Sequence, residues 1–80
     1  MPYIKDDRKS AINTGDLCKG PGELNYVLTR DILEYWNNSG QNYQALNDIS
    51  GAMTEALAEF RRRVLVPYEK TKIRDNGDMY

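Results

Sequence analysis

Three consecutive arginines, Arg61 to Arg63, are the side chains of this sequence best suited to binding an anion. A guanidinium presents a planar fork of donors that matches phosphate and carboxylate groups. Consecutive side chains of a helix point about 100° apart, so the three arginines cannot form one flat patch. Arg62 can pair with Glu59, three residues earlier, and Glu59 can also reach Arg63 at the favourable i+4 spacing. This spacing indicates different roles for the three, with Arg61 and Arg63 as candidates for an anion site.

A strip of polar side chains runs along the same helix toward Arg61. A helical-wheel projection groups Asn47, Ser50, Thr54 and Arg61 on one flank. One interpretation is the solvated edge of an amphipathic helix, since most polar helix edges face water. The other is a ligand-facing wall, in which amide and hydroxyl groups act as adaptable donors and acceptors and Arg61 contacts the anion.

These side chains need a long helix to position them, and the sequence predicts one over about residues 42–66. Its apolar positions recur at steps of three and four, which places them on one stripe. They are Leu46, Ile49, Met53, Leu57, Phe60 and Val64. Ala45, Ala52 and Ala56 flank the stripe and would let another helix approach closely. Pro67 has no N–H group, so we expect the helix to end or kink there. The tail that follows can restart as a helical turn over residues 68–72, and a turn is predicted over residues 75–78.

A first long helix is predicted over about residues 21–38, because Pro21 suits an early helical position and Gly40 can adopt the left-handed conformation that ends a helix. One face is apolar, but Tyr26 and Leu33 project from the opposite side, and a helix apolar on two sides is usually buried on two sides. We therefore expect it to pack on the second helix in one protomer and on another copy across an interface. The short connection favours an antiparallel hairpin.

The amino-terminal part is predicted to hold a short helix with Asp6 and Asp7 in its first turn and Ile12 as its one buried anchor, followed by a loop over residues 13–22. The fold class is thus all-α: a single helical domain over residues 1–80, with a hairpin of about 21–38 and 42–66, assembled as a homo-oligomer. An 80-residue chain buries too little surface to be comfortably stable alone. Cys18 is the only cysteine, so self-association is the expected support.

Composition limits the classes of function. The formal net charge of −1 does not favour nucleic acid as a partner, and no apolar run approaches the roughly 20 residues that span a bilayer. The start of the chain lacks a signal-peptide core, so we expect a cytoplasmic protein. There is no histidine, Cys18 has no evident base, and Asp31 is expected to pair with an arginine. We therefore expect no enzyme, no catalytic residue, no metal site and no cofactor.

Four motifs resemble a family of short phage and bacterial proteins of unknown function. They are the start Met1-Pro2-Tyr3-Ile4, the run from Gly22 to Thr29, the run from Glu59 to Val64 with Pro67-Tyr68-Glu69, and the end Asn76-Gly77-Asp78-Met79-Tyr80. The resemblance spans nearly the whole chain and implies an autonomous small domain of phage type, in the host cytoplasm if phage-encoded. It implies no particular site residue.

The leading hypothesis is a non-enzymatic oligomer that sequesters a small anionic, nucleotide-like ligand, as phage proteins that capture host immune signals do. Tyrosines can stack on bases and arginines can bind phosphate. The expected ligand-binding residues are Tyr3, Asn25, Thr29, Asn47, Thr54, Arg61, Arg63 and Tyr68. The alternative is a protein interaction module that binds a host or phage protein through the side of Tyr26, Leu33 and Trp36.

Overall fold

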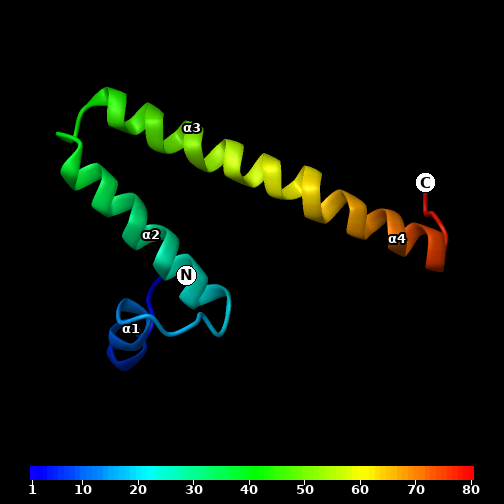
Figure 1. The fold of residues 1–80 in the computed structure, drawn as a ribbon, viewed down its shortest axis with the longest axis horizontal. Helices are drawn as coiled ribbons and strands as arrows, with labels where there is room; N and C mark the ends of the chain where they lie inside the picture. Colours follow the sequence, from blue (N-terminus) through cyan, green and yellow to red (C-terminus); the bar gives the residue numbers. More distant parts are fainter. The chain divides into compact units, whose positions relative to one another are not determined.

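The computed structural model describes all 80 residues and contains helices and connecting segments without any strand, so the all-α prediction is confirmed. The elements are α1 (Asp6–Asn13), α2 (Pro21–Asn38), α3 (Tyr43–Phe60), a π-helical turn η1 (Arg61–Leu65) and α4 (Val66–Asn76) (Figure 1). None of these helices combines the length and the apolarity needed to cross a membrane. The chain divides into two compact units, Met1–Leu46 and Asn47–Tyr80, which are described in turn.

In the first unit, α2 has the bounds that the sequence predicts. Proline at the first position and an acid in the first turn begin it at Pro21. At the other end, the Ser39 amide donates to the Trp36 carbonyl at 3.4 Å, and Gly40 takes the left-handed conformation with φ of 81°. Only a residue without a side chain adopts that conformation at little cost, so Gly40 stops the helix as expected.

α1 packs against α2 in the same unit. Ile12 is 5% exposed and is the only large apolar side chain that is buried, which confirms it as the anchor of α1. The extended lead-in also approaches the start of α2 closely, at Gly22. A Cβ atom there would lie 3.2 Å from the Met1 carbonyl oxygen and 3.7 Å from the Ile4 side chain. A glycine at this position therefore lets the lead-in approach the helix backbone.

α3 begins one residue later than predicted, because Asn42 is its cap rather than its first residue. The Asn42 side-chain oxygen accepts a hydrogen bond from the Ala45 amide at 2.9 Å, which satisfies a free N–H group of the first turn. The Asn42 carbonyl accepts a further bond from the Leu46 amide at 3.2 Å. Ala45, 1% exposed, is the other buried apolar residue of the chain.

In the second unit, the α-helical hydrogen-bond pattern is interrupted before Pro67, and α4 then continues to Asn76, further than the helical turn predicted over residues 68–72. The Val66 amide donates to the Arg61 carbonyl, five residues back, so η1 makes a wider turn just before the proline. Pro67 then occupies an early position of α4, where a missing N–H group is tolerated. The stop lies at Gly77, with φ of 89°, so the turn predicted over residues 75–78 starts two residues too early.

The second unit leaves its apolar stripe uncovered. No side chain of Asn47–Tyr80 is buried, and Met53, Leu57 and Phe60 are each about half exposed. The spacing of the stripe was predicted from the sequence, but nothing within this unit packs on it. A single amphipathic helix gains most of its stability from packing of its apolar face, so this stripe needs cover from outside the unit.

Candidate functional site

The arginine run forms the first three positions of η1, and its members have different partners. Arg62 donates a hydrogen bond to one carboxylate oxygen of Glu59, and Arg63 forms an ion pair with the other. The two pairings expected from the i+3 and i+4 spacings are therefore present. Arg61 makes no ion pair and no side-chain hydrogen bond, and it is exposed. The Glu59 carboxylate thus holds Arg63, which the sequence grouped with Arg61 as an anion candidate, and leaves Arg61 available.

The polar strip of the second unit is accessible to solvent along its length. Asn47, Ser50, Thr54 and Arg61 are all exposed. The Thr54 hydroxyl donates to the Ser50 carbonyl at 2.8 Å, so its hydrogen is used within the helix and its lone pairs remain free as acceptors. By helical spacing, Arg63 lies about 160° around the helix from Arg61, on the alanine flank. The two arginines of one copy therefore cannot contact the same small ligand.

The other predicted ligand residues are dispersed. Tyr68, on α4, is exposed, and the Lys72 ammonium lies 5.5 Å from the centre of its ring, at cation–π distance. In the first unit, the Thr29 hydroxyl donates to the Asn25 side-chain oxygen at 3.0 Å, so these two are brought together on α2. Tyr3 is 82% exposed in the lead-in, and its side chain makes no hydrogen bond.

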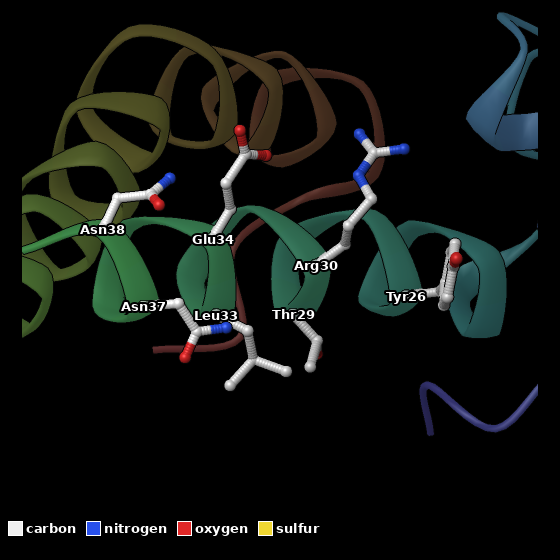
Figure 2. A pocket seen from close by; sticks show the side chains of 7 residues that line it. All are labelled: Tyr26, Thr29, Arg30, Leu33, Glu34, Asn37 and Asn38. Atoms are coloured by element: carbon white, nitrogen blue, oxygen red, sulfur yellow. The ribbon is translucent and has the colours of Figure 1, made fainter. Parts of the chain in front are cut away.

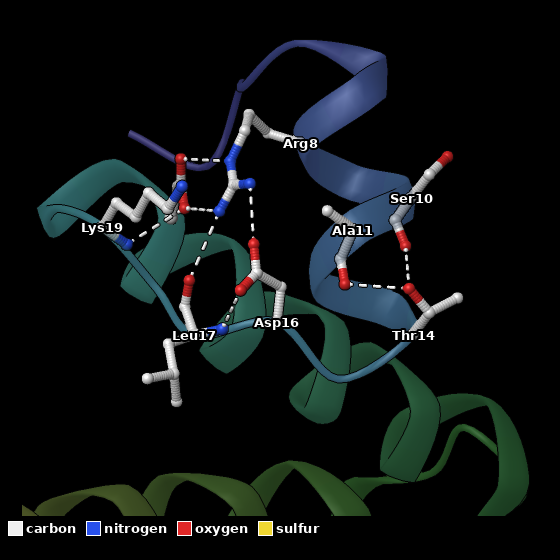
Figure 3. Close-up of polar contacts among 8 residues, drawn as sticks. Arg8, Ser10, Ala11, Thr14, Asp16, Leu17 and Lys19 are labelled. Atoms are coloured by element: carbon white, nitrogen blue, oxygen red, sulfur yellow. Dashed lines mark hydrogen bonds and ion pairs between the residues drawn. The ribbon is translucent and has the colours of Figure 1, made fainter.

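A polar cluster that the sequence did not reveal is centred on Arg8 of α1. Its Nε and Nη2 atoms donate to the two carboxylate oxygens of Glu23 at 3.0 and 2.8 Å, a bidentate pairing. Nη1 donates to Asp16 at 2.9 Å and Nη2 also to the Leu17 carbonyl at 3.3 Å (Figure 3). Glu23 additionally accepts from the Lys19 amide at 3.0 Å. This Arg8 clamp ties α1, the loop and the start of α2 together.

The clamp perturbs the charges that form it. Hydrogen bonds from Arg8 and from the Lys19 amide lower the pKa of Glu23 below its usual value. Hydrogen bonds from Arg8 and from the Leu17 amide lower the pKa of Asp16 in the same way. The two carboxylates raise the pKa of Arg8 further above its already high value. All three groups are therefore held in their charged forms at neutral pH, as a structural clamp requires.

A second contact between α1 and α2 lies further along the helix. The Asn13 amide group donates to the Tyr26 hydroxyl at 3.0 Å, and Arg30 donates to the Asn13 oxygen at 3.0 Å. Arg30 also pairs with Asp31 at 3.1 Å. The expected arginine partner of Asp31 is therefore present. Asp31 is exposed, however, and does not lie buried among apolar side chains.

A shallow open groove of about 480 Å³ continues along α2 from this contact. Figure 2 shows its lining as two rows of side chains that follow the i+4 spacing of the helix. One row holds Tyr26, Arg30, Glu34 and Asn38, and the other holds Thr29, Leu33 and Asn37. A groove between two such rows is the kind of surface into which a ridge of another helix packs. Of the predicted ligand residues, only Thr29 contributes to it.

The sequence matches a domain of unknown function, DUF6899, over residues 1–79. The chain belongs to this family. No curated protein and no solved structure matches it. Membership of DUF6899 agrees with the resemblance to a short family of unknown function, and it assigns no activity to any residue.

Within this DUF6899 chain, the side chains that could do chemistry are dispersed. No group of three or more carboxylate or cysteine side chains is arranged to hold a metal ion. Cys18 is an exposed free thiol in the loop. Two surfaces are therefore candidates for recognition: the Arg61 strip of α3 and η1, and the groove of α2.

Proposed function

We propose that this protein is a non-enzymatic, phage-type binding protein that works as a homo-oligomer and sequesters a small anionic, nucleotide-like ligand. The observation that carries the proposal is the position of Arg61. It is the one arginine of the run without a carboxylate partner, it continues the Asn47 and Thr54 strip, and it begins a π-turn. Such turns are rare and occur frequently at functional sites.

Assembly is the second part of the proposal. The stripe of α3 has no cover within its own unit, and both α2 and α3 carry apolar faces that are half exposed. An antiparallel hairpin of α2 and α3 would cover one face of each helix, and a second copy would cover the rest. In such a symmetric assembly several copies of Arg61 would converge, because each copy places it beside the stripe. Convergent guanidinium groups bind phosphate more strongly than a single exposed one.

A thermal-shift titration tests this function. The probes are cyclic dinucleotides and cyclic ADP-ribose-like compounds, because they carry bases and phosphates in a compact form. A ligand present at 100 times its Kd stabilises the folded state by about 2.7 kcal/mol, which for a domain of this size raises Tm by roughly 10–20 °C. Absence of any shift across the panel would refute the proposal.

Two single substitutions localise the site. Arg61→Ala should abolish the shift, since it removes the unpaired guanidinium. Arg62→Ala is the matched control, because Arg62 belongs to the same turn but pairs with Glu59. If Arg62→Ala removed the shift as completely as Arg61→Ala, the assignment of Arg61 as the anion contact would be wrong.

A protein interaction module is the second candidate, and the groove of α2 favours it. Tyr26 and Leu33 line this groove, and Leu33 is about half exposed. A helix of a host or phage protein could pack its ridge there. A pull-down that recovers one stoichiometric partner would favour this candidate, provided that no small molecule raises Tm. The partner should be lost with Leu33→Arg and kept with Leu24→Arg, which lies on the other face of α2.

A further inference from the structure

η1 changes the direction of every side chain that follows it. The Val66 amide bonds five residues back, to Arg61, whereas an α-helical bond reaches four residues back. The turn therefore holds one extra residue. Each residue after it takes the direction that the preceding residue would have in an uninterrupted α-helix, a rotation of about 100°.

The consequence is largest for Tyr68, which the sequence places on the ligand side. In an uninterrupted α-helix, Tyr68 follows Arg61 by seven residues and points within about 20° of it. After η1, Tyr68 points about 120° away from Arg61. That direction coincides with the apolar stripe of Ile49, Phe60 and Val64, whose members recur at three- and four-residue steps.

Pro67 lies immediately after the π-turn, where a proline conflicts with α-helical bonding. In an α-helix its ring would clash with the Arg63 carbonyl, and it has no N–H group to donate there. Pro67 directly follows the residue that closes η1. A wider turn just before it removes the need for the α-helical bond at this position while the helix continues to Asn76.

We propose that Pro67 is a positioning residue: by imposing the π-turn, it turns Tyr68 away from the Arg61 strip and onto the apolar stripe. This proposal rests on the proposed function, in which Arg61 contacts the ligand. It places Tyr68 on the apolar surface that packs against another helix. The Tyr68 hydroxyl and the Lys72 ammonium over its ring would then lie at the edge of that packed surface.

A pair of histidines that chelates Cu²⁺ reports the register of the helix directly. The chain has no histidine of its own, so the background is low. Arg61→His with Val66→His places two imidazoles five residues apart. They share one side of a π-turn but are separated by about 140° in an α-helix. The control pair, Ser50→His with Thr54→His, lies four residues apart in α3, where an α-helix brings the imidazoles together.

Cu²⁺ titrations followed by Trp36 and tyrosine fluorescence are made in the native background and with Pro67→Ala. The 61/66 pair should bind Cu²⁺ at least about tenfold more tightly than either single-histidine variant in the native background. It should lose that gain with Pro67→Ala, and the 50/54 pair should bind equally in both backgrounds. This readout needs no nucleotide, so it stands or falls separately from the proposed function.

Three results would overturn the proposal. Tight binding by the 61/66 pair in both backgrounds would mean that Pro67 does not impose the turn. Weak binding by this pair in the native background, with tight binding by the 50/54 pair, would mean that the turn is α-helical in solution. Loss of binding by the 50/54 pair with Pro67→Ala would mean that the proline supports the helix as a whole rather than its register.

Discussion

Ile12→Ala should release α1 from α2 while leaving the rest of the chain folded. Ile12 is 5% exposed, and the substitution removes three carbon atoms from the contact. At about 0.8 kcal/mol for each buried methylene, the loss is about 2.4 kcal/mol, at the lower end of the range measured for such substitutions. A site between one short helix and its neighbour can also collapse, which keeps the added cavity cost small. This loss corresponds to an approximately 50-fold larger equilibrium constant for undocking.

Hydrogen exchange of the α1 amides measures that constant, because exchange reports local opening. With Ile12→Ala the amides of α1 should exchange about 50-fold faster, and with Ile12→Val, which removes one carbon, about fourfold faster. Amides of central α2 should keep their rates. Leu17→Ala is the matched control, since Leu17 is 81% exposed in the adjoining loop. Unchanged α1 exchange with Ile12→Ala would show that α1 does not depend on this burial.

Three further predictions concern the same unit. The carboxylates of Glu23 and Asp16 have lowered pKa values in the folded chain. Their contribution to the stability of the docked α1 is therefore fully present above the usual pKa values of about 4.3 and 3.9, and it is lost as the pH falls through the lowered pKa values. Exchange of α1, corrected for intrinsic rates, should therefore be constant from pH 5 to 8 and rise below about pH 4. Arg8→Ala should reduce this dependence, because Arg8 makes the largest contribution to both lowered pKa values. Asn42→Ala should cost about 1 kcal/mol by removing the α3 cap, seen as a lower Tm, whereas Asn47→Ala should leave Tm unchanged. Gly22→Ala should raise Tm slightly, because the gain in helix propensity exceeds the cost of moving the exposed lead-in by a few tenths of an ångström; a lower Tm would show that the lead-in is fixed.

The helices of the first unit could be predicted because local signals mark their ends. Pro21 and Gly40 each act within one turn of α2, and the bounds follow from their backbone preferences alone. Ile12 could be identified as the anchor because it is the one large apolar residue of a short polar helix. In these places local preference and tertiary packing agree, which is why the sequence sufficed.

The Arg8 clamp and the path of the helix past Pro67 depend on information that the local pattern lacks. Arg8 and Glu23 are 15 residues apart, and no periodicity connects them. Two isolated charges near the starts of helices are too common in sequences to predict a specific ion pair. The rule that a proline ends a helix assumes an unbroken α-helical register. At Pro67 the register changes instead, at the cost of one wider turn.

Arg8 and Arg61 differ in how the fold uses their guanidinium groups, and the difference supports the proposed role of Arg61. Three guanidinium nitrogens of Arg8 donate to two carboxylates and a carbonyl, so groups of the same chain occupy its donors. Arg61 donates to no group of its own chain, although Glu59 lies only two residues away and takes both neighbouring arginines. Helix geometry explains why Glu59 does not reach Arg61, because the side chains of residues two apart point about 160° from one another. The polar strip that ends at Arg61 thus carries a cation that the fold leaves unneutralised, and the proposed function assigns this cation to the ligand.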